Sequence, residues 1–233
     1  MKYFTLMTVG LLISLNISAQ DIENNNTTGF IDFNMYYDTR DFNVMTINIL
    51  AKLPNRFQYF SLTNYLGADQ SVDLASFYSE QNLRWQIKKM SSLDLTLQYV
   101  MRQGKANDDF RFGVRWRLSD TPKLKGIFSK LNISYSLNPM FFQFRANAHT
   151  KYMTQVEHVY RIKLYKDRIY LGGFADQNFV YSNGKVAFKW VTEHQLGTRI
   201  VDQLYVVAEF RINDFLESDN TGLGIGLEYV IKF

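Results

Sequence analysis

Cysteine is absent from this sequence of 233 residues. Neither a disulfide bond nor a metal site built on thiolates can therefore hold the fold, and the absence is compatible with an oxidising compartment outside the cytoplasm. Beyond the N-terminus the sequence also lacks any run of about 18 apolar residues, which excludes membrane-spanning helices. Basic residues are dispersed and the formal net charge is only +4, so the sequence predicts no surface for nucleic acid.

Proline is scarce, with 3 residues, whereas aromatic residues make up 16% of the chain and include 15 Tyr and 19 Phe. Aromatic side chains fit the pleated surface of a sheet, so this composition favours β-structure over helix or disorder. The mean hydropathy of −0.21 is low for a membrane protein. It is acceptable for a membrane β-barrel, because alternate residues of each strand face a wet interior.

The first residues have the pattern of a secretory signal peptide. Lys2 supplies a positive charge, residues 3–15 are mostly apolar, and small residues precede a cleavage site after Ala19. An uncleaved anchor helix is the alternative, but the apolar run of about 13 residues is short for that role. We therefore expect a signal peptide in residues 1–19, a flexible segment in residues 20–28 and one barrel domain in residues 29–233.

From Gly29 onward the chain repeats segments of about ten residues in which apolar and polar side chains alternate, each followed by a turn signal. In residues 109–118 aromatic and aliphatic side chains alternate with Arg111, Arg115 and Arg117. As a helix this segment would carry arginine on every face, whereas as a strand it is apolar on one side and basic on the other. The sequence therefore predicts an all-β, antiparallel, up-and-down transmembrane barrel.

Twelve such segments can be recognised, although the first three alternate less regularly and ten strands are the alternative count. They are residues 30–38, 42–53, 56–66, 75–87, 93–102, 109–118, 130–138, 152–164, 168–178, 185–200, 204–213 and 222–233. Short turns and longer loops, such as residues 139–150, alternate between them, as they do when short turns face the periplasm.

The connection near residues 121–130 predicts a short helix at the periplasmic rim. Thr121 is suited to cap this helix and Pro122 to occupy its first position. Leu124, Ile127 and Phe128 then follow at helical spacing, so the helix is amphipathic. We expect it to act as a plug or a resting element rather than as a functional site.

The last segment alternates apolar and small or polar residues and ends on Tyr229, Ile231 and Phe233. It resembles the recognition strand of outer-membrane barrels, a resemblance that covers about ten residues. The resemblance implies assembly by the barrel-assembly machinery. A soluble barrel or sandwich would share the alternation, since any half-buried strand shows it, but it would not need the signal peptide, the aromatic excess and the terminal Phe together.

If the apolar side chains face lipid, the charged ones face the lumen, because each Arg or Lys would cost about 2–4 kcal/mol at the middle of the bilayer. The candidate lumen-lining residues are Arg84, Arg102, Arg111, Arg115, Arg117, Glu157, Arg161, Glu193, Glu209 and Arg211. The same parity adds Lys163, Lys189, Arg199 and Glu228. Two interpretations follow: a narrow wet channel that selects solutes, or a scaffold whose lumen is closed by Arg–Glu pairs.

An enzyme is the less favoured interpretation. Barrel hydrolases such as outer-membrane phospholipase carry a His-x-Ser pair on one strand, but no serine follows His149, His158 or His194 at that spacing. A serine from a neighbouring strand is the remaining route. His158 and His194 share the outward parity, and no metal-ligand spacing is present. We therefore expect neither catalysis, nor a cofactor, nor a metal.

In length, strand number and aromatic, charge-rich interior the chain resembles the Tsx-like nucleoside channels of the outer membrane, with weak matches at residues 57–60 and 226–233. The resemblance implies passive uptake of nucleosides, and it assigns no binding residue. The Ser-Ala-Gln end of the signal is similar to export signals of Bacteroidota. The expected location is the bacterial outer membrane. The expected partners are its lipid and lipopolysaccharide, the assembly machinery and small polar solutes.

Overall fold

The structure, a computed structural model, describes residues 27–67, 74–104, 108–145, 153–182 and 184–233. The predicted signal peptide and His149 lie outside these residues, so their predictions stay untested. The strands are β1 (Thr28–Asp38), β2 (Phe42–Lys52), β3 (Phe57–Gly67), β4 (Leu74–Gln86), β5 (Leu93–Arg102), β6 (Asp109–Arg117), β7 (Ile133–Arg145), β8 (Met153–Tyr165), β9 (Ile169–Ser182), β10 (Lys185–Val201), β11 (Leu204–Asn213) and β12 (Thr221–Lys232). The helical segments are α2 (Lys125–Lys130) and two 3-10 helices, Pro54–Arg56 and Leu118–Asp120.

All twelve strands form one closed antiparallel barrel in which each strand pairs with its sequence neighbours. This confirms the predicted fold and the count of twelve. β1 closes the barrel against β12, with registers running from Phe30 opposite Lys232 to Asp38 opposite Gly224. The backbone N–H of Gly29 donates to the carbonyl oxygen of Phe233 at 2.8 Å. Closure leaves no unpaired sheet edge, which a wall in hydrocarbon requires.

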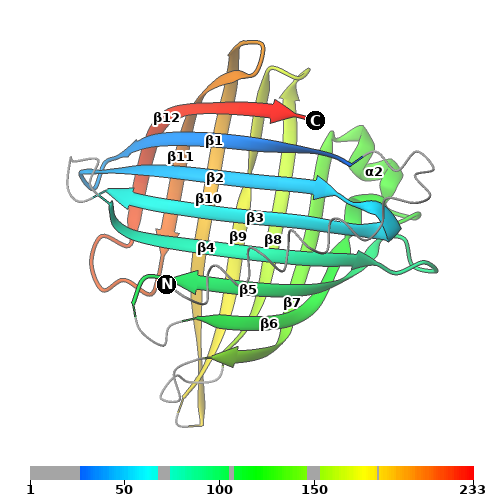
Figure 1. The fold of residues 1–233 in the computed structure, drawn as a ribbon, viewed down its shortest axis with the longest axis horizontal. Helices are drawn as coiled ribbons and strands as arrows, with labels where there is room; N and C mark the ends of the chain where they lie inside the picture. The colour runs from blue at the N-terminus through cyan, green and yellow to red at the C-terminus, as the bar shows by residue number, and fades with distance from the viewer. Residues whose placement is uncertain (1–26, 68–73, 105–107, 146–152, 183) are drawn as a thin grey trace, which may run out of the picture.

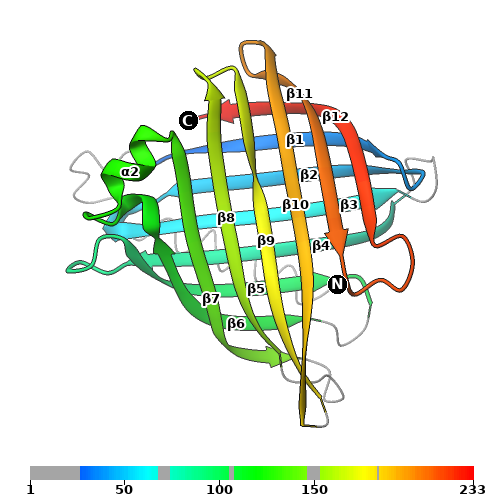
Figure 2. The same ribbon diagram turned by 180° about the vertical axis from the view of Figure 1, so that it is seen from behind.

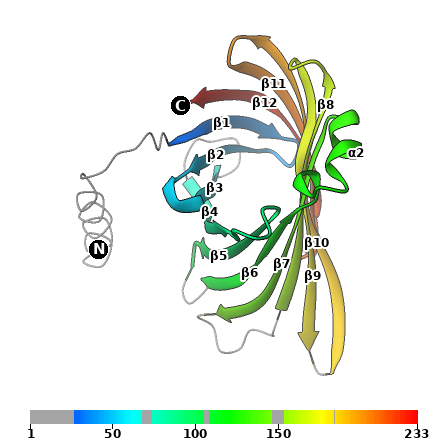
Figure 3. The same ribbon diagram turned by 90° about the vertical axis from the view of Figure 1, so that its right-hand side faces the viewer.

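The barrel consists of two walls whose strands cross at a steep angle. Strands β1 to β6 run nearly horizontally in front in Figure 1, while β7 to β10 run nearly vertically behind them. Figure 2 shows the second wall from its outer side, and Figure 3 shows the two walls edge-on with the interior between them. Strong tilt of this kind is what closure of a twisted sheet demands. Side chains from opposite walls therefore meet inside.

The two faces of the wall follow the predicted alternation. On β1 the inward residues Asp32, Asn34 and Asp38 are buried, whereas the outward Met35 and Tyr37 are 62% and 51% exposed. Large exposed apolar side chains continue around the outer surface on the other strands. Within the described part of the chain, no helix is long and apolar enough to cross a bilayer.

One strand is longer than the sequence predicted. The segment 139–150 was expected to be a loop, but β7 continues through Pro139 to Arg145. The missing N–H of Pro139 is tolerated because Pro139 has no ladder partner on β6, and the β6–β7 register also shifts nearby, between Phe112 and Gly113. Gly113 allows this approach, because a Cβ there would overlap the carbonyl oxygen of Pro139. The proline and the loop-like composition of this segment therefore predicted a loop, whereas β7 continues through it as far as Arg145.

The predicted helix exists as α2, but its predicted cap is wrong. The helix starts at Lys125, and Thr121 instead follows the 3-10 helix Leu118–Asp120. The Thr121 hydroxyl accepts a hydrogen bond from the Trp116 indole at 2.9 Å and donates to the carbonyl oxygen of Arg117 at 3.2 Å, so it is not available as a cap. The helix packs on the outer side of β7 (Figure 3), so it does not plug the lumen.

Candidate functional site

The barrel interior contains a cavity of about 1350 Å³. All ten sequence-predicted candidates line it: Arg84, Arg102, Arg111, Arg115, Arg117, Glu157, Arg161, Glu193, Glu209 and Arg211. The structure thus brings these residues together around one space, while their part in solute passage stays a prediction. Of the further residues of the same parity, Glu228 also lines the cavity, and Lys163 instead pairs with Asp167 in the β8–β9 turn at 2.9 Å.

One group of charges on β5 and β6 is held by ion pairs. Asp94 lies opposite Arg115 in the β5–β6 register, and the Arg115 guanidinium contacts its carboxylate at 2.6 Å. Arg117 reaches the same carboxylate at 3.1 Å. Asp94 is 2% exposed, so these guanidinium groups satisfy a carboxylate that water hardly reaches. Nearer the other end of the strands, Arg102 contacts Asp109 at 2.8 Å.

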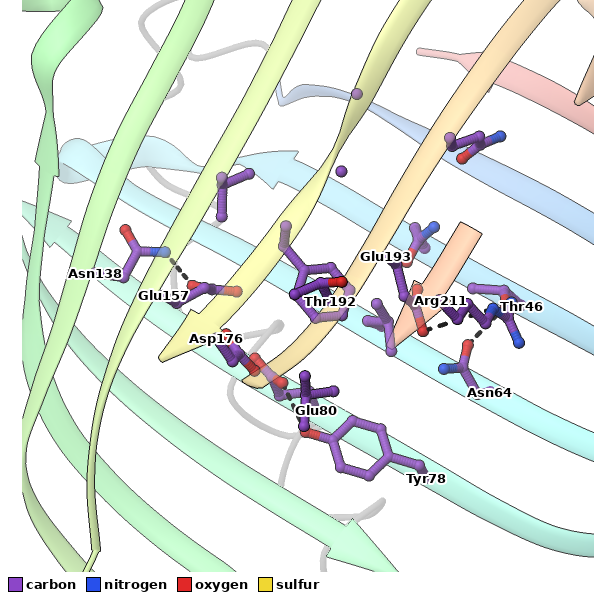
Figure 4. Close-up of a pocket in the computed structure, with 18 of the residues that line it drawn as sticks. Thr46, Asn64, Tyr78, Glu80, Asn138, Glu157, Asp176, Thr192, Glu193 and Arg211 are labelled. Atoms are coloured by element: carbon purple, nitrogen blue, oxygen red, sulfur yellow. Dashed lines mark hydrogen bonds and ion pairs between the residues drawn. The ribbon is translucent and has the colours of Figure 1, made fainter. Parts of the chain in front are cut away.

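A second group of carboxylates, from β4, β8 and β9, points into the middle of the cavity (Figure 4). Glu80 accepts hydrogen bonds from the Tyr78 hydroxyl at 2.9 Å, from the Asn82 amide at 3.1 Å and from the Gln98 amide. Neutral donors, rather than arginines, therefore satisfy this buried carboxylate.

Glu157 and Asp176 complete this second group on the opposite wall. Glu157 accepts a hydrogen bond from the Asn138 amide, and the Asp176 Oδ1 atom is buried without a partner. Among the described residues, Glu80, Glu157 and Asp176 take part in no ion pair. Three carboxylates without a bonded cation thus share the centre of the lumen, where low solvent screening strengthens their field.

Arg84 is the cationic counterpart of this central group. It is 5% exposed, and its Nε atom has no hydrogen-bond partner. Its guanidinium carbon lies 5.2 Å from the centre of the Phe60 ring, a cation–π arrangement. Phe60, together with Leu50 and Leu62 of the same wall, gives the cavity an apolar side. The lumen therefore offers both charged side chains and an apolar, aromatic patch to the same solute.

In the described part of the chain, side-chain hydrogen bonds also link strands that are not neighbours in the barrel. The Tyr170 hydroxyl on β9 donates to Glu228 on β12. The Gln195 amide on β10 donates to Asn34 on β1 at 3.3 Å, and Arg111 on β6 donates to Gln155 on β8 at 2.7 Å. These contacts reach across the interior and narrow it without filling the cavity.

Further ion pairs lie at the end of β1 and on β10 and β11. Arg211 donates to Glu209 from its Nε atom and lies 4.0 Å from Glu193. Arg40 contacts Asp38, a residue with 0% exposure, at 2.8 Å. These pairs lie near the β1–β2 and β11–β12 connections, at the end of the barrel opposite to the β4–β5 turn. One mouth of the cavity is thus bordered by alternating carboxylates and guanidinium groups.

Sequence reasoning missed Glu80, Asp94, Asp109 and Asp176 as candidates, although each borders or supports this interior. The available signal was parity: Glu80 alternates in step with Arg84 on β4, and Asp94 in step with Arg102 on β5. The neutral donors Asn82 and Gln98 share the same inward parity, but parity alone does not say which carboxylate they meet, because that depends on the register between strands.

The two described histidines lie on the outer face, as predicted. The Nδ1 atom of His158 shares a hydrogen bond with the Tyr135 hydroxyl at 2.7 Å, and the Nδ1 atom of His194 shares one with the Tyr160 hydroxyl at 2.8 Å. Each tyrosine bonds the Nδ1 atom of its imidazole, and no serine hydroxyl is bonded to either ring in the described residues. No group of three or more His, Asp or Glu side chains in the described ranges is arranged to hold a metal ion.

No family model matches the sequence, and no curated protein matches it. Among solved structures, the KdgM porin is similar with a TM-score of 0.54 at 14% identity, over 86% of this chain and 98% of the porin. The KdgM porin in complex with disordered oligogalacturonate is similar with a TM-score of 0.52, at the same identity and coverage. At this identity the likeness concerns the fold, so the chain has the fold of a porin-like barrel.

Proposed function

We propose that this chain is a channel of the bacterial outer membrane through which small polar solutes diffuse. The observation that carries the proposal is a cavity of about 1350 Å³, lined by charged side chains, inside a closed wall whose outer face is apolar. A wall of this kind satisfies all of its backbone polar groups in a bilayer, and a wet interior is what its inward charges need. The fold shared with a porin supports the proposal.

The lining favours cationic and neutral solutes over anions. Carboxylates outnumber guanidinium groups around the cavity, and the central group of Glu80, Glu157 and Asp176 has no bonded cation. Channels that prefer cations are commonly lined by rings of Asp or Glu. The oligogalacturonate of the KdgM complex is acidic, so we do not extend it to this chain. Nucleosides, which are neutral and aromatic, fit an interior that also offers Phe60, and they are one solute to be tested.

The second candidate is a non-conducting scaffold. It is favoured by the hydrogen bonds that cross the interior, above all Tyr170 to Glu228 and Arg111 to Gln155. In a scaffold these bonds would hold opposite walls together, and the lumen would pass no solute. Twelve strands stand between the eight-stranded barrels that their own side chains fill and the wider porins.

The two candidates are separated by conductance of the purified, refolded protein in planar bilayers. We expect discrete current steps, a reversal potential in a KCl gradient that indicates preference for potassium, and uptake of nucleosides, amino acids or sugars into liposomes. A preparation from cells without the gene controls for contaminating porins. Absence of current together with absence of uptake of every solute would overturn the channel and leave the scaffold.

A further inference from the structure

The connection between β6 and β7 contains a surface that the channel does not use. Around α2, Leu124, Ile127, Phe128 and Leu131 recur at the spacing of one helical face. Phe128 stacks on the Tyr135 ring of β7, with ring centroids 6.2 Å apart and planes 10° from parallel. This contact holds the helix against the outer side of β7, and Figure 2 shows α2 beside one end of that strand.

Two apolar side chains of this face stay uncovered. Ile127 is 59% exposed and Leu131 is 57% exposed. The outer wall beside them exposes apolar side chains of its own, and Trp116 at the end of β6 is tied to the same connection by its hydrogen bond to Thr121. A tryptophan with an apolar body and one satisfied N–H is typical of the level where hydrocarbon meets lipid headgroups.

Lysines border this apolar face. Lys123, Lys125 and Lys130 are all exposed, and none takes part in an ion pair among the described residues. Asp120, the one carboxylate of the connection, is bonded to Arg117 instead. Lysine stems can lie along apolar surface while their ammonium groups reach outward, and these three lysines stand within eight residues of Ile127 or Leu131 in the chain.

We propose that α2 and its flanking lysines form a binding site for an anionic phospholipid. The exposed Ile127 and Leu131 contact the acyl chains, and the ammonium groups of Lys123, Lys125 and Lys130 contact the phosphodiester. The inference rests on the proposed membrane location but not on conduction. With the short β2–β3, β4–β5 and β8–β9 turns at the same end of the barrel, this end faces the periplasm and the lipid belongs to the inner leaflet. Juxtamembrane lysines attract anionic lipid in this way.

Native mass spectrometry of the full-length protein tests the site by titration with phosphatidylglycerol and, separately, with phosphatidylethanolamine. We expect tighter retention of phosphatidylglycerol, and a variant with Lys123→Gln, Lys125→Gln and Lys130→Gln should lose about fivefold in affinity for each lysine. The matched control carries Lys88→Gln, Lys89→Gln and Lys166→Gln. These lysines are also exposed, in other turns at the same end, so the change in net charge is identical.

The contact is tested independently by fluorescence quenching with brominated phosphatidylglycerol. In a background with Trp85→Phe and Trp190→Phe, Trp116 reports on the site, and Ile127→Ser with Leu131→Ser should reduce its quenching. Equal loss of affinity in the α2 variant and the control variant would overturn the site, because it would show diffuse attraction to the whole rim. Preference for lipopolysaccharide over phosphatidylglycerol would overturn the assigned leaflet. Conductance is unaffected in either variant, so failure of the channel and failure of the lipid site are distinguishable.

Discussion

Two sets of carboxylates in the same lumen are satisfied in different ways. Asp94, on β5, is held by Arg115 and Arg117 of the neighbouring segment, so its charge is neutralised inside the wall. Glu80 and Glu157, farther toward the centre, are held by amides and a hydroxyl, so no cation is bonded to either carboxylate. Burial alone therefore does not distinguish a carboxylate with a structural role from one that acts on solutes. The two kinds differ in the donor that is bonded to them: arginine in the first case, and an amide or a hydroxyl in the second.

The largest difference should appear in stability. Asp94→Asn leaves Arg115 and Arg117 without their shared carboxylate, and we expect it to lower the free energy of unfolding by about 3 kcal/mol. Glu157→Gln keeps an acceptor for the Asn138 amide and should cost less than about 1 kcal/mol. Urea unfolding of both variants in lipid bilayers, followed by heat-modifiable migration, measures the difference. Equal costs would remove the distinction between the two sets.

Ion selectivity should show the reverse order, with a moderate effect. Glu157→Gln combined with Asp176→Asn removes two carboxylates to which no arginine is bonded, so the preference for cations should fall a few-fold. Asp94→Asn, in whatever fraction folds, should shift selectivity less, because its charge is already balanced. Reversal potentials in a KCl gradient measure both. A larger shift for Asp94→Asn would contradict the assignment of the central group as the selective one.

The smallest effect is expected from single cysteine substitutions, which test whether both sets of carboxylates face the same lumen. Single cysteines at Phe112 and Val114 should react with a lipid-soluble maleimide, whereas cysteines at Arg111 and Arg115 should react only with a small water-soluble one. The chain has no cysteine of its own, so each variant carries one thiol. The reverse pattern would invert the inner and outer faces and with them the whole comparison.

The faces of the strands could be predicted from the sequence because a period of two leaves only two choices, and lipid fixes which choice is made. The contacts across the lumen could not. Tyr170 meets Glu228 across the lumen although β9 and β12 are not neighbours in the sheet, and no local pattern in the sequence encodes the tilt of the strands that brings them together. The same limit hid the role of Gly173, where φ is +149° and a Cβ would overlap the carbonyl oxygen of Glu193 on β10. Close approach of neighbouring strands depends on such positions, which read as ordinary glycines in sequence.

Because β1 pairs with β12, the chain could start at a different strand while every strand kept the same neighbours in the barrel. Since Gly29 and Phe233 already exchange backbone hydrogen bonds, a short peptide linker could join these two positions without moving either strand. A new opening in the β4–β5 turn would then give a circularly permuted barrel with the same twelve neighbours. Such a permutant would keep the equilibrium structure while changing which hairpin emerges first and which pair of strands must find each other last.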